Sequence, residues 1–270
     1  MLRWEEKQDI GETYQKVEAA VAEWREREQE VLPEVRDTFH EKLIISWIFH
    51  DSALEGEVLT YSEIKAATDR NIISDVSLIP AYEDIKAFDS AARFAIDYAA
   101  SRKKPINLDL VRELLALVDP AEGAKGAPYR KENPLHRLYY HEIAPPEKVP
   151  QQMRKFGEWL AQIHKADAHP IALAVAAHRR LMGIFPWPKA TGRVARILSN
   201  LILLRHDYPL AVIHSIDRQR YYEALRTDDD KLEFLYLEAV ETTATAATRV
   251  YDEAIARAAR ATSGRGRRAS

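Results

Sequence analysis

The residues with the clearest chemical potential form the segment FPWPKATGRVAR, residues 185–196. Two prolines within three residues cannot lie inside a helix, so this segment must join two helices. Gly192 then falls in the first turn of the second helix, where free N–H groups and the helix dipole favour an anion. Arg193 and Arg196 project from one face of that helix, and basic residues at a helix start oppose the dipole unless an anion is bound. With Lys189, they predict a phosphate cradle rather than a solvated basic surface.

The same segment resembles the signature of the Fic (Fido) family, H-P-F-x-[D/E]-G-N-G-R-x-x-R. Pro186 matches its proline, Gly192 its last glycine, and Arg193 and Arg196 its two arginines. Trp187 is a conservative replacement of the phenylalanine. The resemblance implies ATP or another nucleotide as the ligand, and a nucleotidyl transferase as the nearest class of enzyme.

Four positions depart from that signature. Phe185 stands where the family has its general base, a histidine, and Lys189 stands where a carboxylate holds magnesium. Ala190 and Thr191 replace the glycine and asparagine of the anion hole. A phenyl ring cannot accept a proton, and an ammonium group cannot bind magnesium, although it can neutralise phosphate. We therefore expect a degenerate member that binds a phosphate ligand, holds no metal in the usual way and has weak or no AMP transfer.

The resemblance extends to the flanking segments. HPIALAVAAHRRLMGI is similar to the helix before the motif, and ILSNLILLRHDYPLAVI to the segment after it. The proline-rich stretch 126–150 falls where the family has its flap, a β-hairpin that aligns the target protein. Four flap residues are candidates for contact with a target: His136, Arg137, Tyr139 and His141.

A second motif lies upstream, in DSALEG, residues 51–56. It resembles the inhibitory motif [S/T]-x-x-x-E-[G/N] of autoinhibited members, whose glutamate pairs with the second motif arginine and blocks seating of the γ-phosphate. Glu55 and Gly56 match this pattern, whereas Asp51 takes the Ser/Thr position. Glu55 is accordingly a candidate inhibitory residue, with an ordinary helix-end acid as the alternative.

Several histidines and tyrosines are further candidates. His178 lies two helical turns before the motif, about 10 Å away, and is best explained by packing. Other possible bases have no fixed spacing to a second ligand: His136, His141, and His214 with Asp217. A metal site of His136, His141 and Glu142 has no supporting spacing, so we predict none. Tyr221 or Tyr222 could stack on a purine, with a core aromatic as the equal alternative.

Periodic apolar residues predict an all-α fold, a Fido-type helical bundle with one small β-hairpin flap at Leu135–Ile143. The expected helices cover residues 10–30, 35–53, 60–69, 82–102, 107–118, 149–166, 170–184, 193–204, 218–225 and 231–261. Residues 1–105 form an N-terminal helical region with the inhibitory-type helix, 106–262 the Fic core, and 263–270 a disordered basic tail.

Composition and charge exclude few functions. The net charge is −3 with mixed signs, which does not indicate nucleic-acid binding, and no apolar run has the length of a membrane span. Cysteine is absent, and we expect a cytoplasmic protein whose oligomeric state stays open. Two alternatives to the degenerate nucleotide-binding protein remain: an active transferase of nucleotidyl or other phosphate-linked groups with non-standard chemistry, and a non-catalytic module that docks a partner strand on the flap.

Overall fold

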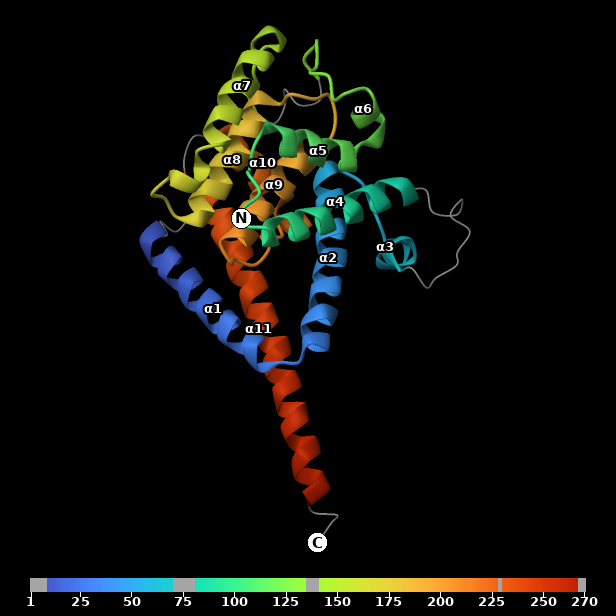
Figure 1. Ribbon diagram of the computed structural model, residues 1–270, viewed down its shortest axis with the longest axis vertical. Coiled ribbons are helices and arrows are strands. Elements are labelled where there is room, and N and C mark those ends of the chain that lie inside the picture. The colour runs from blue at the N-terminus through green and yellow to red at the C-terminus, as the bar shows by residue number, and fades with distance from the viewer. Residues whose placement is uncertain (1–8, 70–80, 135–140, 228–229, 267–270) are drawn as a thin grey trace.

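The computed structural model describes residues 9–69, 81–134, 141–227 and 230–266, and this part of the chain is helical without a strand (Figure 1). Its α-helices are α1 (Ile10–Glu30), α2 (Pro33–Glu55), α3 (Tyr61–Thr68), α4 (Tyr82–Ala100), α5 (Leu108–Val118), α6 (Pro120–Ala124), α7 (Val149–Leu160), α8 (Pro170–Ile184), α9 (Thr191–Arg205), α10 (Arg218–Arg226) and α11 (Lys231–Gly266). Three short 3₁₀ turns lie between them: η3 (Pro146–Lys148), η4 (Ile163–Lys165) and η5 (Ser215–Asp217).

Helix α9 is the centre of the fold. Every residue from Thr191 to Leu203 is buried, as expected of a helix that is covered on all sides. Helices α8, α4 and α5 pack against it. The two arginines of the motif are therefore held within the core of the molecule rather than on a surface helix.

Helix α2 brings a second set of charges to α9. Its middle is anchored by Trp47, which packs edge to face on Phe88 of α4 at 5.4 Å between ring centroids. It ends at Gly56 with φ 95°, whose N–H bonds to the Ala53 carbonyl at 3.1 Å. Outside this core, α1 lies along α11, and α11 projects beyond the other helices (Figure 1).

The structure confirms most of the predicted helices. Thr60 caps α3 through the predicted capping box with Glu63, and Asn107 is the residue that caps α5. Helix α11 continues to Gly266, into the segment predicted to be disordered; its Ala- and Arg-rich sequence favours helix.

The β-hairpin flap is a correction to the prediction. No strand occurs in the described residues around it, and 135–140, which hold His136, Arg137 and Tyr139, lie outside the described part. After these residues the Ala144 N–H donates to the Gly183 carbonyl of α8 at 2.8 Å, so this part of the backbone bonds to a helix. No helix in the described ranges is long and apolar enough to cross a membrane.

The left-handed cap of α2 yields a test with a matched control. We expect Gly56→Ala to lower the free energy of unfolding by about 1 kcal/mol, because a side chain is strained at φ 95°. Gly183→Ala lies inside α8 with open space around its new methyl group and should raise stability by about 0.5–1 kcal/mol. Urea denaturation measures both, and equal effects of the two substitutions would contradict this assignment.

Candidate functional site

The loop before α9 is shaped by a buried arginine. Phe185 ends α8 in the left-handed region, with φ 48°. The Arg130 guanidinium donates from Nε to the Phe185 carbonyl at 2.6 Å and from another nitrogen to the Ala144 carbonyl, while its backbone N–H donates to the Pro186 carbonyl at 2.9 Å. Arg130 therefore ties the proline-rich segment to the motif loop by satisfying carbonyls at the end of α8.

The remainder of the loop is closed by Thr191. Its hydroxyl donates to the Trp187 carbonyl at 3.2 Å and accepts from the Trp187 N–H at 3.3 Å. The indole N–H of Trp187 in turn donates to the Ala127 carbonyl at 3.3 Å. Both side chains are completely buried. Thr191, predicted to face a ligand, instead turns inward and closes the loop, so it holds the start of α9 in place.

Acidic residues at the end of α2 and just after it meet the motif arginines of α9. Arg196 donates from Nη2 to Glu55 at 2.8 Å, from Nε to Asp51, and from Nη1 to the Tyr221 hydroxyl at 3.2 Å. Arg193 pairs through Nη2 with Glu57 at 2.6 Å, and its Nε lies 3.4 Å from Asp51. Burial alone would lower the pKa of Arg196, but the Asp51 carboxylate and then Glu55 outweigh it and raise that pKa.

Gly192 shows why the first turn of α9 accepts an anion. A Cβ at this position would lie 2.5 Å from Glu55 Oε1 and 3.0 Å from Arg196 Nη1. Only glycine allows a carboxylate to come this close to the helix start. The Glu55 carboxylate thus occupies the place that the sequence assigns to an anion at the N-terminus of α9.

A cavity of about 610 Å³ opens beside this carboxylate. Lys189, Ala190 and Arg193 line one side of it, and the exposed ammonium group of Lys189 is at its edge. The remaining charged lining is acidic: Glu55, Glu57, Glu83, Asp84 and Asp119. The predicted cluster is therefore assembled in part, because Arg196 lies behind Glu55 and does not line the cavity.

Behind Arg196, a chain of hydrogen bonds runs through the core. The Tyr221 hydroxyl lies 3.0 Å from His178 Nε2, and the Tyr236 hydroxyl lies 2.8 Å from His178 Nδ1. Burial, together with the Arg196 charge, lowers the pKa of His178 well below its ordinary value. His178 is thus a neutral histidine between two tyrosines, in keeping with the packing role expected from the sequence.

The tyrosines predicted to stack on a purine hold other groups in this structure. Tyr221 is completely buried beneath Arg196. Tyr222 donates its hydroxyl to the Leu54 carbonyl at 3.0 Å, and Arg218 donates to the same carbonyl at 3.0 Å. Helix α10 thereby fixes the C-terminal end of α2 above the motif. Base binding by either ring remains a prediction.

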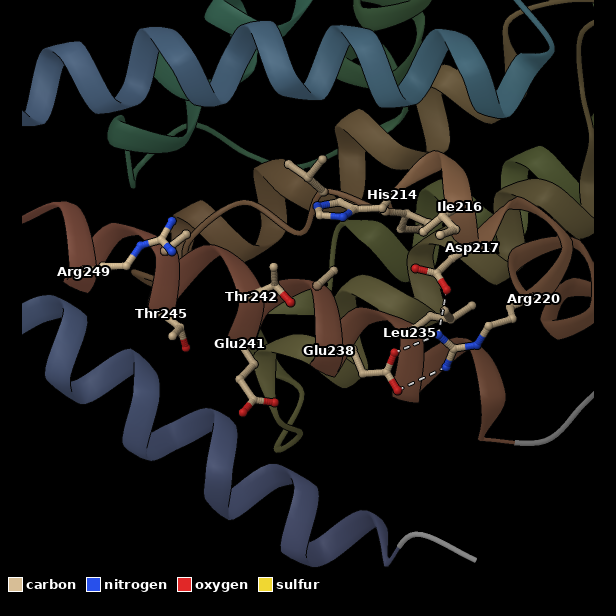
Figure 2. A pocket seen from close by; sticks show the side chains of 14 residues that line it. His214, Ile216, Asp217, Arg220, Leu235, Glu238, Glu241, Thr242, Thr245 and Arg249 are labelled. Atoms are coloured by element: carbon tan, nitrogen blue, oxygen red, sulfur yellow. Dashed lines mark hydrogen bonds and ion pairs between the residues drawn. The ribbon is translucent and has the colours of Figure 1, made fainter. Parts of the chain in front are cut away.

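The other candidate histidines lie in different surroundings. His141 contacts the Met182 carbonyl through Nε2 at 2.9 Å, and its ring is 6.1 Å from the Phe185 ring, so this flap histidine is at the motif. His214 stacks on His50 at 4.4 Å. With Asp217, it lines a separate cavity of about 1100 Å³ along α11, where Arg220 pairs with Asp217 and Glu238 (Figure 2). The two cavities share no lining residue.

Sequence reasoning missed three partners in the site, namely Arg130, Glu57 and the ion pairs of Asp51. A signal for Asp51 was present: Asp51 and Glu55 are four apart on α2, and Arg193 and Arg196 three apart on α9, so each pair shares a helix face. In the described part of the chain, no group of three or more His, Cys, Asp or Glu residues is placed to hold a metal ion.

The model of the Fic/DOC family matches residues 105–203, which include the motif loop and most of α9. This segment of the chain is similar to Fic/DOC domains. Proteins named protein adenylyltransferase Fic from Nematostella vectensis and Drosophila melanogaster are each 29% identical to it over 66% of its length. The match spans 42% and 36% of those relatives, so the chain covers about two fifths of their length.

Solved structures show the same Fic fold. A Fic-domain-containing signaling protein from Bacteroides thetaiotaomicron has a TM-score of 0.76 at 24% identity, over 88% of this chain and 98% of that one. Fic-1 (residues 134–508) from Caenorhabditis elegans has a TM-score of 0.68 at 21% identity, over 89% of this chain and 71% of that one. The similarity of fold therefore extends beyond the segment that the family model matches.

Because His178 is buried and neutral, it should make the folded protein less stable at acidic pH. The folded protein keeps it uncharged, while the unfolded chain binds a proton there below about pH 6.5. We expect the free energy of unfolding to fall as the pH drops below 6.5, by at most about 1.4 kcal/mol per pH unit from this group. His178→Gln should flatten that slope, measured by urea denaturation at pH 7 and pH 5. The exposed His164→Gln is the control, and an unchanged slope in His178→Gln would contradict the assignment.

Proposed function

We propose that this protein binds a nucleotide or another phosphate-linked ligand at the start of α9, and that the Glu55 carboxylate blocks the site in the resting state. One observation carries the proposal: the Glu55 carboxylate already lies against Gly192 and Arg196, in the place of an anion. A phosphate that entered this place would replace one anion by another with more acceptor oxygens and a higher charge.

Two basic residues beside the Glu55 carboxylate favour a phosphate, against the acidic residues that line the rest of the cavity. Lys189 and Arg193 supply two cations at the cavity, and the first turn of α9 supplies N–H groups. Glu57, whose side chain is 40% exposed, is the most accessible of the three acidic partners. Its pairing with Arg193 is therefore the easiest to exchange for a ligand, because exposed ion pairs contribute little to stability.

The same residues do not fit the usual transfer of AMP. Phe185 is buried and has no group that accepts a proton, so a hydroxyl nucleophile has no base at the motif position. Lys189 stands at the position of the metal-binding carboxylate, where its ammonium group would repel magnesium. We propose that ligand binding, rather than efficient transfer, is the principal activity of this site. The transferase named for the relatives remains the second candidate, because those relatives are 29% identical to this chain.

Calorimetric titration with ADP tests the binding site. We expect Glu55→Ala to bind ADP at least tenfold more tightly than the native protein, since one charge-assisted hydrogen bond amounts to about 1.5–3 kcal/mol. Adding Arg193→Ala to this variant should reverse the gain. Arg112→Ala removes an exposed arginine of α5 that pairs with Asp109, and in the same background it should leave ADP binding unchanged. Equal ADP binding in all four proteins would contradict the site.

Incubation with labelled ATP, magnesium and protein substrates tests transfer. We expect no appreciable AMP transfer by the native protein, and none by Phe185→His alone, because Lys189 still occupies the metal position. Phe185→His, Lys189→Asp and Thr191→Asn together should give transfer once Glu55→Ala has opened the site. Strong labelling by the native protein that is lost in Arg193→Ala and does not depend on metal would establish the second candidate. Lys189 would then act in place of magnesium.

A further inference from the structure

We propose that Asp51 is a permanent counter-ion of Arg196 and keeps this arginine from binding the ligand. When Glu55 is displaced, a triphosphate then binds no more tightly than a diphosphate. This inference rests on the proposed function and specifies its ligand class: mono- and diphosphate groups rather than triphosphates. It concerns Asp51, which stands where the inhibitory pattern has serine or threonine.

Asp51 contacts both motif arginines from a completely buried position. One of its oxygens accepts from Arg196 Nε, and the other lies 3.4 Å from Arg193 Nε. The side chain of Asp51 is 0% exposed, against 12% for Glu55 and 40% for Glu57. Of the three carboxylates around the arginines, Asp51 is thus the one that solvent and ligand reach least.

The position of Asp51 within α2 makes it the hardest of the three to displace. Glu55 is the last residue of α2, next to the left-handed Gly56, and its side chain is 12% exposed at the edge of the cavity, so a ligand can reach it. Asp51 lies one turn earlier, inside the helix, between the buried residues Ile48 and Leu54. A ligand that pushes Glu55 aside therefore leaves the bond between Asp51 and Arg196 intact.

The consequence follows from the charges. When Glu55 leaves, only Nη2 of Arg196 is released, because Nε still pairs with Asp51 and Nη1 still bonds to Tyr221. The positive charge of Arg196 remains cancelled by a buried neighbour, and a further phosphate near it gains little attraction. The cations left for the ligand are Lys189 and Arg193 at the cavity, whose other charged lining is acidic. Two cations facing acidic groups limit the ligand to one or two phosphate groups.

A titration series with AMP, ADP and ATP, without metal, tests this in the opened Glu55→Ala protein. We expect ADP and ATP to bind Glu55→Ala with dissociation constants within about threefold of each other, and ATP to bind Glu55→Ala/Asp51→Asn about tenfold or more tightly than ADP. The control Glu55→Ala/Asp89→Asn removes another buried acid, which pairs with Arg93 within α4. This control should have the same ratio of ADP to ATP dissociation constants as Glu55→Ala.

Each other outcome overturns part of the proposal. ATP binding more than tenfold tighter than ADP to Glu55→Ala would show that Arg196 is available despite Asp51. Equal ADP and ATP affinities in Glu55→Ala/Asp51→Asn would show that Asp51 does not set the preference. These results leave the proposed function intact, whereas no ADP binding by Glu55→Ala would overturn both. The first measurement does not need the Asp51 variant, so it decides even if that variant does not fold.

Discussion

Two arginines buried in the central helix α9 must be neutralised, and the structure neutralises them with carboxylates from α2 and from Glu57, just after this helix. Removing a guanidinium group from water is costly unless an opposite charge and hydrogen bonds replace its hydration. Arg196 obtains these from Asp51, Glu55 and Tyr221, and Arg193 obtains them from Asp51 and Glu57. The C-terminal end of α2 must therefore stay on α9 unless another anion takes its place. The position of the α2 end on α9 therefore depends on which anion, the Glu55 carboxylate or a ligand, occupies the site.

The surrounding elements hold both sides of this contact. Arg130 and Thr191 fix the loop that starts α9, while Arg218 and Tyr222 of α10 both donate to the Leu54 carbonyl near the end of α2. Each of these is a polar group that finds its partner in the backbone of another element. These contacts hold the charged groups in position. The net charge of the cluster, two arginines and three carboxylates, is set by the residues of α9, of α2 and of the segment just after α2.

The sequence predicts the helical fold well, because it follows from local rules. Proline pairs, glycine caps and apolar periodicity determine where α8, α9 and α2 begin and end. It predicts the individual contacts less well, because these depend on which helix packs on which. Thr191 bonds within its own loop, and Tyr221 packs beneath Arg196 instead of lining the cavity. The pairing of Asp51 with both arginines needs the approach of two helices that are far apart in the sequence. The predicted flap strand is not seen in the described residues, which leave out 135–140.

The displacement of one anion by another at the start of α9 is tested most directly by a crystal structure of Glu55→Ala grown with ADP. We expect a phosphate group in the place of the Glu55 carboxylate, next to Gly192 and within hydrogen-bond distance of Arg193, with Asp51 still paired to Arg196. ADP bound elsewhere, such as in the cavity along α11, or a phosphate group that leaves the contacts of Arg193 unchanged, would contradict this account of the site.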